Sequence, residues 1–182
     1  MVVVPIASFI FGGWMMGWAS APYDPRWALN YPKRSALMAL AGPSANLLLV
    51  LTSGIWLRAG MYFHFFQTPE HFPYYGHVVF PPFEGIVQAA QGGPAAALAI
   101  ILSIFFSLNL LLFLFNLIPF PPLDGSSVVM LFMSDTTARR YMGFFQNSGF
   151  GLIGLLIAWK FFPRIFYPAG MFVLKILYAG MR

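Results

Sequence analysis

The chain has 182 residues, of which 59% are apolar and 8% are charged, and it contains no cysteine. Soluble domains are about a quarter charged, so the composition excludes an ordinary soluble domain, and the lack of cysteine excludes disulfides, thiolate metal sites and cysteine nucleophiles. The net charge of +5 does not indicate nucleic-acid binding, because the basic residues are scattered singly or in pairs rather than gathered in a patch.

Two long apolar stretches, residues 35–57 and 94–118, predict membrane-spanning helices. A helix needs about 20 apolar residues to cross a hydrocarbon layer about 30 Å thick, and both stretches are long enough. Lys33 and Arg34 precede the first stretch and Arg58 follows it, as expected at the ends of a span.

Both ends of the chain carry less regular apolar segments. Residues 2–21 are uncharged but interrupted by glycine and proline, which leaves open a span or a re-entrant segment. Residues 149–179 contain Lys160, Pro163 and Arg164, so this segment is either a kinked span followed by an interfacial helix or a short hairpin.

The charged residues orient the spans. The segment before residue 35 and the segment that contains Arg139 and Arg140 are basic. The loop over residues 59–93 has no Lys or Arg, and its charged residues are Glu70 and Glu84. The positive-inside rule therefore places this loop outside the cell and the basic segments in the cytoplasm. We expect an all-α fold, a polytopic transmembrane helical bundle in a lipid bilayer, with residues 1–182 forming a single membrane domain.

The stretch NLIPFPPLDG, residues 116–125, follows the second span directly. Its prolines remove backbone donors and extend the residues before them, which predicts an unwound, Pro-rich segment after the helix. An ionised Asp124 at the centre of the bilayer would cost about 2.5 to 3.5 kcal/mol, so a buried Asp124 needs a partner. The alternative, which has equal weight, is that Asp124 lies in solvent at the cytoplasmic interface and caps a helix.

The stretch ALAGPSAN lies near the start of the first span. Pro43 is expected to kink the helix, Gly42 allows close helix contact, and Asn46 places an amide in hydrocarbon, where it must form a hydrogen bond. Taken alone, Asn46 is more often structural than functional. Because Asn46, Asn116 and Asp124 all lie toward the cytoplasmic side, however, these side chains could converge.

The segments AGPSAN and NLIPFPPLDG resemble the GPxxN and NxxPxPxLDG motifs of the site-2 protease family, which are intramembrane zinc metalloproteases. The resemblance covers roughly residues 10–130. It implies zinc as cofactor, Asp124 as the third zinc ligand, and membrane-protein helices as substrates, in an integral multi-pass protein that we expect in a prokaryotic plasma membrane. It also implies that the following residues line the site or bind substrate: Asn46, Asn116, Gly42, Pro43, Pro119 and Pro121.

The family's HExxH motif, which supplies two zinc ligands and the general base, does not occur in this sequence. The histidines are His64, His71 and His77, in the loop predicted outside, across the membrane from Asp124. We interpret them as solvated loop residues, with a separate metal site that includes Glu70 as the alternative. The chain alone is therefore expected to be inactive and to contribute no catalytic residue.

Three hypotheses remain for the function. The first is a protease present as an N-terminally truncated chain, which the apolar start without a basic flank favours. The second is a complete pseudoprotease that binds membrane helices without cutting them. The third is a transporter or channel subunit in which Asp124 titrates or binds a cation, although few other polar residues line the spans. The sequence predicts no oligomeric state.

Overall fold

The computed structural model describes residues 6, 10, 24–69, 85–90, 92–146 and 150–180. Most of the predicted segment 2–21, together with His71 and His77, lies outside the described residues. The chain divides into two compact units, residues 1–30 and 31–182. In the first, helix α2 (Pro25–Asn30) begins where the backbone N–H of Arg26 donates a hydrogen bond to the Asp24 carboxylate, 2.8 Å away.

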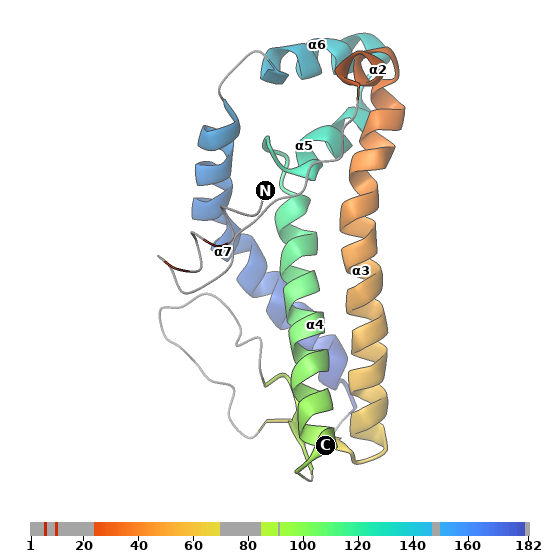
Figure 1. Cartoon of the computed structure of the whole chain (residues 1–182), viewed down its shortest axis with the longest axis vertical. Coiled ribbons are helices and arrows are strands. Elements are labelled where there is room, and N and C mark those ends of the chain that lie inside the picture. Colours follow the sequence, from red (N-terminus) through yellow and green to blue (C-terminus); the bar gives the residue numbers. More distant parts are fainter. Residues whose placement is uncertain are drawn as a thin grey trace. The chain divides into compact units, whose positions relative to one another are not determined.

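Two long helices form the framework of the second unit. Helix α3 (Pro32–Tyr62) and helix α4 (Pro94–Asn116) pack side by side and run in opposite directions (Figure 1). Each begins with a proline in its first turn, where the missing N–H costs no helical hydrogen bond. Within the described part of the chain, these two helices are long and apolar enough to cross a membrane, which agrees with the two predicted spans. A polytopic bundle stays a prediction.

The outer surface of α3 is strongly apolar. Leu48, Ile55 and Trp56 have 63%, 66% and 65% of their surface exposed. Soluble proteins rarely expose contiguous apolar surface of this kind. The core lies on the other side of the helix, where Val50 and Leu57 are buried with apolar residues of α4 and of a later helix. The exposed face therefore suits contact with lipid.

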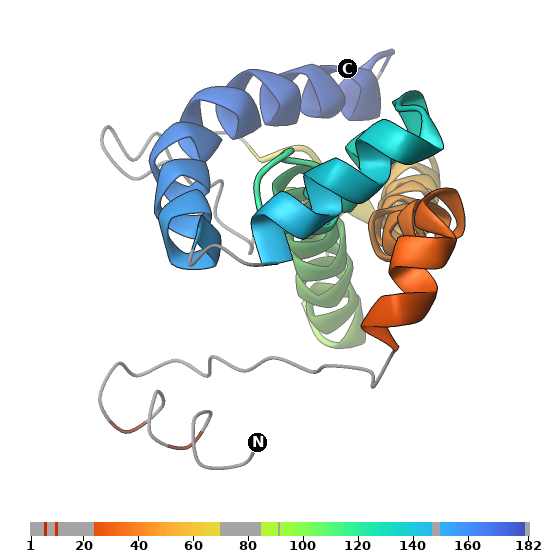
Figure 2. The same cartoon turned by 90° about the horizontal axis from the view of Figure 1, so that it is seen from above.

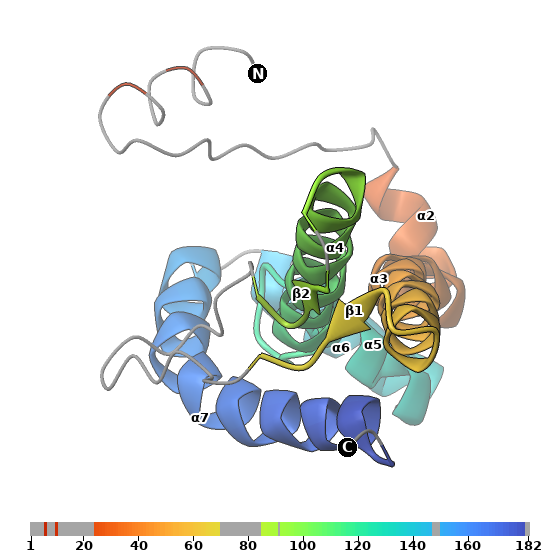
Figure 3. The ribbon, with the colours of Figure 1, turned by 90° about the horizontal axis from the view of Figure 1, so that it is seen from below.

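A small sheet packs against the C-terminal end of α3, beyond Arg58. Strand β1 (Phe66–Gln67) pairs with strand β2 (Gln88–Ala89) in antiparallel register, with Phe66 opposite Ala89 (Figure 3). Gly60 leaves space that the Phe66 ring fills, because a Cβ at this position would overlap the ring. His64 lies in the turn between α3 and β1, is exposed, and has a positive φ of 60°.

The remaining helices lie after α4. Residues 117–123 form turns, and they are followed by α5 (Asp124–Val128), the 3-10 helix η1 (Val129–Phe132), α6 (Asp135–Gln146) and α7 (Phe150–Tyr178). Of the two structures that the sequence left open for residues 149–179, a hairpin does not form: α7 is one helix, and it is bent (Figure 2). Proline inside a helix removes a hydrogen bond and is a usual cause of a bend, and α7 contains Pro163 and Pro168.

Candidate functional site

The two sequence motifs meet where α5 packs against α3. Gly42 of α3 lies so close to Asp124 of α5 that a Cβ built on Gly42 would be 3.0 Å from the Asp124 Oδ2 atom and 4.0 Å from its Cγ atom. Gly42 lies about 15 Å along α3 from its start at Pro32, given a rise of 1.5 Å per residue. The carboxylate therefore lies beside α3, in the half of the helix that begins with the basic residues Lys33 and Arg34.

Asn46 lies one helical turn beyond Gly42. Residues four apart on a helix share a face, so Asn46 lies on the face of α3 that carries Gly42. Its side chain is half-buried. Asn116 is the last residue of α4 and is also half-buried. Pro43 is almost completely buried, and α3 continues through it without a break. Its missing N–H leaves the carbonyl of Ala39 without the usual helical donor.

The connection from α4 to α5 determines where Asp124 lies. Helix α4 ends at Asn116, and Asp124 is the first residue of α5. Between them, the backbone turns back on itself so tightly that a Cβ on Gly125 would overlap the carbonyl groups of Leu117 and Ile118. Only glycine leaves room for this contact, which holds the start of α5 against the end of α4.

A serine and a second glycine also hold this connection. The buried Ser126 hydroxyl donates a 2.7 Å hydrogen bond to the carbonyl of Leu123, the residue that precedes α5. On the other side of the connection, Gly154 of α7 lies against the carbonyl of Pro121, and a Cβ there would overlap it. Pro119 is exposed and Pro121 is half-buried. Gly154 is not predictable from the sequence, since a glycine in a glycine-rich apolar helix gives no signal of its own.

The polar groups of the site have unused hydrogen-bonding capacity. Within the described residues, the side chains of Asp124, Asn46 and Asn116 form no hydrogen bond to the protein. The Asp124 carboxylate is half-buried, and its neighbour Gly42 is exposed. A ligand could therefore reach the carboxylate from the surface between α3 and α5. The convergence of all three side chains stays a prediction, since the contact that the structure shows is between Gly42 and Asp124.

The described residues do not complete a catalytic zinc site. An Asp oxygen is a suitable ligand for zinc, but a catalytic site holds three protein ligands. In the described part of the chain, no group of three His, Cys, Asp or Glu side chains lies together. His64 follows the opposite end of α3, more than about 30 Å along the helix from Gly42. His64 therefore cannot join Asp124, and Asp124 is at most one ligand of a larger site.

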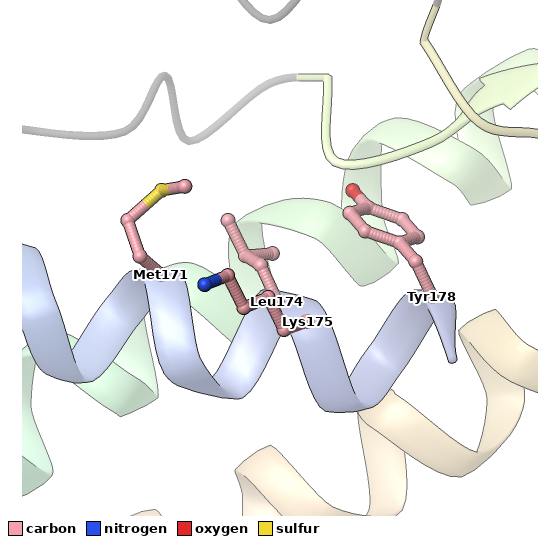
Figure 4. A pocket seen from close by; sticks show the side chains of 4 residues that line it. All are labelled: Met171, Leu174, Lys175 and Tyr178. Atoms are coloured by element: carbon pink, nitrogen blue, oxygen red, sulfur yellow. The ribbon is translucent and has the colours of Figure 1, made fainter.

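An apolar pocket lies elsewhere in the molecule. Near the C-terminal end of α7, Met171, Leu174, Lys175 and Tyr178 line a shallow hollow (Figure 4). The Tyr178 hydroxyl does not contribute a free polar group there, because it donates a 2.6 Å hydrogen bond to the carbonyl of Ile86. The pocket brings together no acid, amide or histidine, and we assign no chemistry to it.

Comparison with known proteins adds one finding. The family model of peptidase family M50 matches residues 5–158, a range that includes both motifs and most of the described helices. No curated protein and no solved structure matches the chain significantly.

Proposed function

The chain belongs to peptidase family M50, the site-2 protease family, and we propose that it acts as an intramembrane zinc metalloprotease that hydrolyses peptide bonds of membrane-protein substrates. Members of this family are membrane-embedded and zinc-dependent, and the two apolar helices α3 and α4 suit that setting. The observation that supports the proposal most directly is the contact between Gly42 and Asp124. It brings together in space the two family motifs that this sequence contains.

In this proposal, Asp124 is a zinc ligand. Its carboxylate is half-buried beside the first span and has no hydrogen-bond partner within the described residues, so its oxygens are available to a cation. A buried acid without such a partner would be unfavourable in the membrane. Two further ligands and the general base would have to come from another polypeptide segment, since the sequence contains no HExxH.

We further propose that Asn46 and Asn116 bind the substrate backbone. The carbonyls of a substrate helix are engaged in its own hydrogen bonds, so the helix must unwind locally before a peptide bond can be attacked. Asparagine amides offer both donors and acceptors to the backbone groups that unwinding frees. Gly42, Pro43, Pro119 and Pro121 then shape the surface on which the unwound segment lies. We also propose that the protein is an integral multi-pass protein of a prokaryotic plasma membrane, and the apolar helices α3 and α4 support a membrane location.

The test compares two aspartates that each begin a helix. Asp124 is the first residue of α5, and Asp135 is the first residue of α6 and is exposed. The protein is purified from its native membrane and incubated with a reconstituted membrane-protein substrate. We expect Asp124→Ala to abolish cleavage and Asp135→Ala to retain it. A zinc chelator should abolish cleavage by the unaltered protein, and added zinc should restore it. Cleavage that survives both Asp124→Ala and chelation would contradict the proposal.

A second candidate function is a pseudoprotease that binds membrane helices without cutting them. It is favoured by the incomplete ligand set of the described residues and by the absence of HExxH from the sequence. In the same assay, a pseudoprotease would leave the substrate intact but retain it on the purified protein, with or without chelator. Asn46→Ala would then weaken retention, whereas Asp124→Ala would have little effect.

A further inference from the structure

Helix α7 carries a stripe of buried residues. Ala158, Phe162 and Phe166 are buried and belong to the core that α3 and α4 share with α7. Gly154 is buried too and lies four residues before Ala158, so these four residues recur about once per turn on one side of the helix. The Phe162 ring packs edge-on against Phe115 of α4, with 5.1 Å between the ring centres. The α7 stripe is therefore the packing face of this helix.

The α7 stripe becomes smaller toward the connection between α4 and α5. Phe162 meets a side chain of α4, whereas Gly154 meets backbone, because a Cβ there would overlap the Pro121 carbonyl oxygen and lie 3.2 Å from the carbonyl carbon. Figure 1 shows that α7 begins near the α5 end of α4 and runs toward its opposite end. Gly154 thus allows α7 to touch the backbone of the connection. A larger residue at this position must displace either the connection or α7.

Helix α7 is held in place beyond Gly154. Arg58 of α3 donates hydrogen bonds of 2.9, 3.1 and 2.7 Å to carbonyls at the C-terminal end of α7. The Tyr178 hydroxyl donates a 2.6 Å hydrogen bond to the Ile86 carbonyl, just before β2. These bonds and the buried rings of the stripe restrain α7 along its length. A clash at Gly154 is therefore relieved chiefly by movement of the connection.

The connection transmits such a movement to Asp124. Asp124 lies three residues after Pro121, and one of the two residues between them is a proline with a fixed φ. The Leu123 N–H donates a 3.0 Å hydrogen bond to the Phe120 carbonyl, and the Leu123 carbonyl accepts a 3.0 Å bond from the Ser126 N–H. Leu123 is also buried in the core that contains the α7 stripe. The backbone from Pro121 to Asp124 therefore moves as one piece.

We propose that Gly154 is a positioning residue for the candidate site. Its contact with the Pro121 carbonyl sets where the Asp124 carboxylate lies beside α3. This inference rests on the proposed function, in which Asp124 holds zinc. Because zinc–oxygen bonds are about 2.0 to 2.2 Å long, an oxygen displaced by several tenths of an ångström is a poorer ligand. Loss of a group that orients a metal ligand typically costs about 10- to 100-fold in metal affinity or activity.

A disulfide reports the position of Asp124 without zinc. The sequence has no cysteine, so Gly42→Cys combined with Asp124→Cys introduces the only two. A Cβ on Gly42 lies 4.0 Å from the Asp124 Cγ atom, whose place the second sulfur takes, so a small adjustment closes the bond. The rate of disulfide formation under mild oxidation is measured on the folded full chain in detergent. Adding Gly154→Ala should slow this rate at least several-fold.

Gly170→Ala is the matched control for Gly154→Ala. Gly170 lies in the same helix, but among the described residues a Cβ there would touch only the Phe166 ring, at 4.0 Å. Both exchanges replace a helical glycine of α7 by alanine and favour the helix equally. Gly170→Ala should leave the rate of disulfide formation unchanged. A difference between the two variants therefore reports the contact with the connection.

Phe162→Leu tests the same contact without an overlap, in case Gly154→Ala does not fold. It removes the ring that holds α7 beside Phe115, so α7 can withdraw from the connection. We expect slower disulfide formation, by a smaller factor than for Gly154→Ala. Phe161→Leu is its control, because Phe161 is the neighbouring residue and is exposed. Its rate should equal that of the parent cysteine pair.

Zinc affinity supplies the second readout. Protein purified from its native membrane is titrated with a chelator, and the zinc that it retains is measured. Gly154→Ala should release zinc at an about 10- to 100-fold lower chelator concentration, and kcat should fall with KM nearly unchanged. Gly170→Ala should behave like the unaltered protein in both measurements.

The outcomes separate this inference from the proposed function. If Gly154→Ala matches Gly170→Ala in disulfide formation and zinc release, the inference is overturned and the proposed function stands. Disulfide formation that is equal in Phe162→Leu and Phe161→Leu would also overturn the inference. A parent cysteine pair that forms no disulfide would contradict the contact between Gly42 and Asp124 and overturn it as well. Unaltered protein that holds no zinc would contradict the proposed function and, with it, the inference.

Discussion

Gly42 and Asp124 lie in direct contact although they belong to different helices and to different motifs, with 3.0 Å between a Cβ position on Gly42 and the Asp124 Oδ2 atom. Glycine leaves space for the carboxylate here, because a Cβ on Gly42 would make the carboxylate move by a few tenths of an ångström. The contact gives a physical reason why a glycine precedes Pro43 in α3. It also makes the position of the carboxylate sensitive to a single methyl group.

Gly42→Ala is expected to displace the Asp124 carboxylate by a few tenths of an ångström or to turn it away from α3. If Asp124 holds zinc, a small displacement of a reacting group lowers turnover strongly, and we expect a loss of roughly tenfold or more. Thermal stability should not fall, because alanine favours a helix by about 0.8 to 1 kcal/mol over glycine. The cleavage assay and thermal unfolding in detergent measure the two effects separately.

Gly143→Ala is the matched control for this exchange. Gly143 is also a glycine within a helix, but a Cβ there meets nothing within 4 Å. Its exchange should leave cleavage unchanged. Equal loss of activity in both variants would show that helix rigidity, and not the contact with Asp124, is responsible.

Gly125→Ala is expected to destabilise the protein much more than Gly42→Ala. Here the Cβ would meet backbone carbonyls of Leu117 and Ile118 rather than the end of a side chain, so the α4–α5 connection must shift. Overpacking usually costs about 1 to 3 kcal/mol, and an overlap with backbone belongs at the upper end of that range. Thermal unfolding in detergent measures the loss. Unchanged stability would mean that the connection adjusts without strain.

Sequence patterns were sufficient for the framework of the fold. The apolar stretches 35–57 and 94–118 predicted two membrane-spanning helices, and the structure has helices long and apolar enough for that role over Pro32–Tyr62 and Pro94–Asn116. Composition and length determine a helix in hydrocarbon, because every backbone group must be paired within the segment. Helix α6 was not predictable from the sequence, because its residues have too little apolar character for a span and its position depends on contacts with α3.

The site was predictable only in part. Motif resemblance predicted Gly42, Asn46 and Asp124 as site residues, and the structure brings Gly42 and Asp124 into contact. The packing of Gly125 on Leu117 depends on how the chain turns after α4, which no periodicity encodes. The zinc-ligand role of Asp124 stays a prediction. Arg58 was assigned only as a flank of the first span, and its partners lie in α7, too distant in sequence for any local pattern to indicate them.

Arg58→Gln is expected to lower stability by about 1.5 to 3 kcal/mol. The guanidinium donates hydrogen bonds of 2.9, 3.1 and 2.7 Å to the carbonyls of Ile176, Leu177 and Ala179, at the C-terminal end of α7. The last carbonyls of a helix lack their usual donors, although the Ile176 carbonyl also accepts from the backbone N–H of Ala179 at 3.3 Å. A cation also interacts favourably with this end of the helix dipole. Hydrogen bonds to charged groups are the stronger kind, which sets the magnitude. Thermal unfolding of detergent-solubilised protein is the measurement.

Two further variants define what Arg58 contributes. Arg58→Lys keeps the charge but loses the forked geometry that reaches several carbonyls, so an intermediate loss is expected. Lys33→Gln removes an exposed charge from the opposite end of α3 and should have almost no effect. If Arg58→Lys were as stable as the unaltered protein, charge alone would explain the stabilisation and the hydrogen-bond geometry would not matter.

Ser107→Ala is expected to preserve or raise stability, unlike most exchanges of buried residues. The hydroxyl oxygens of Ser103 and Ser107 on α4 are buried, and neither has a hydrogen-bond partner among the described residues. A buried hydroxyl without a partner costs about 1 to 3 kcal/mol, and alanine removes that cost while favouring the helix.

Ser53→Ala is the control, because the buried Ser53 hydroxyl donates to the Leu49 carbonyl at 2.6 Å. We expect Ser53→Ala to be neutral or destabilising and Ser107→Ala to raise the unfolding temperature. A lower unfolding temperature for Ser107→Ala would show that its hydroxyl binds a partner in the membrane, such as a water molecule between the helices.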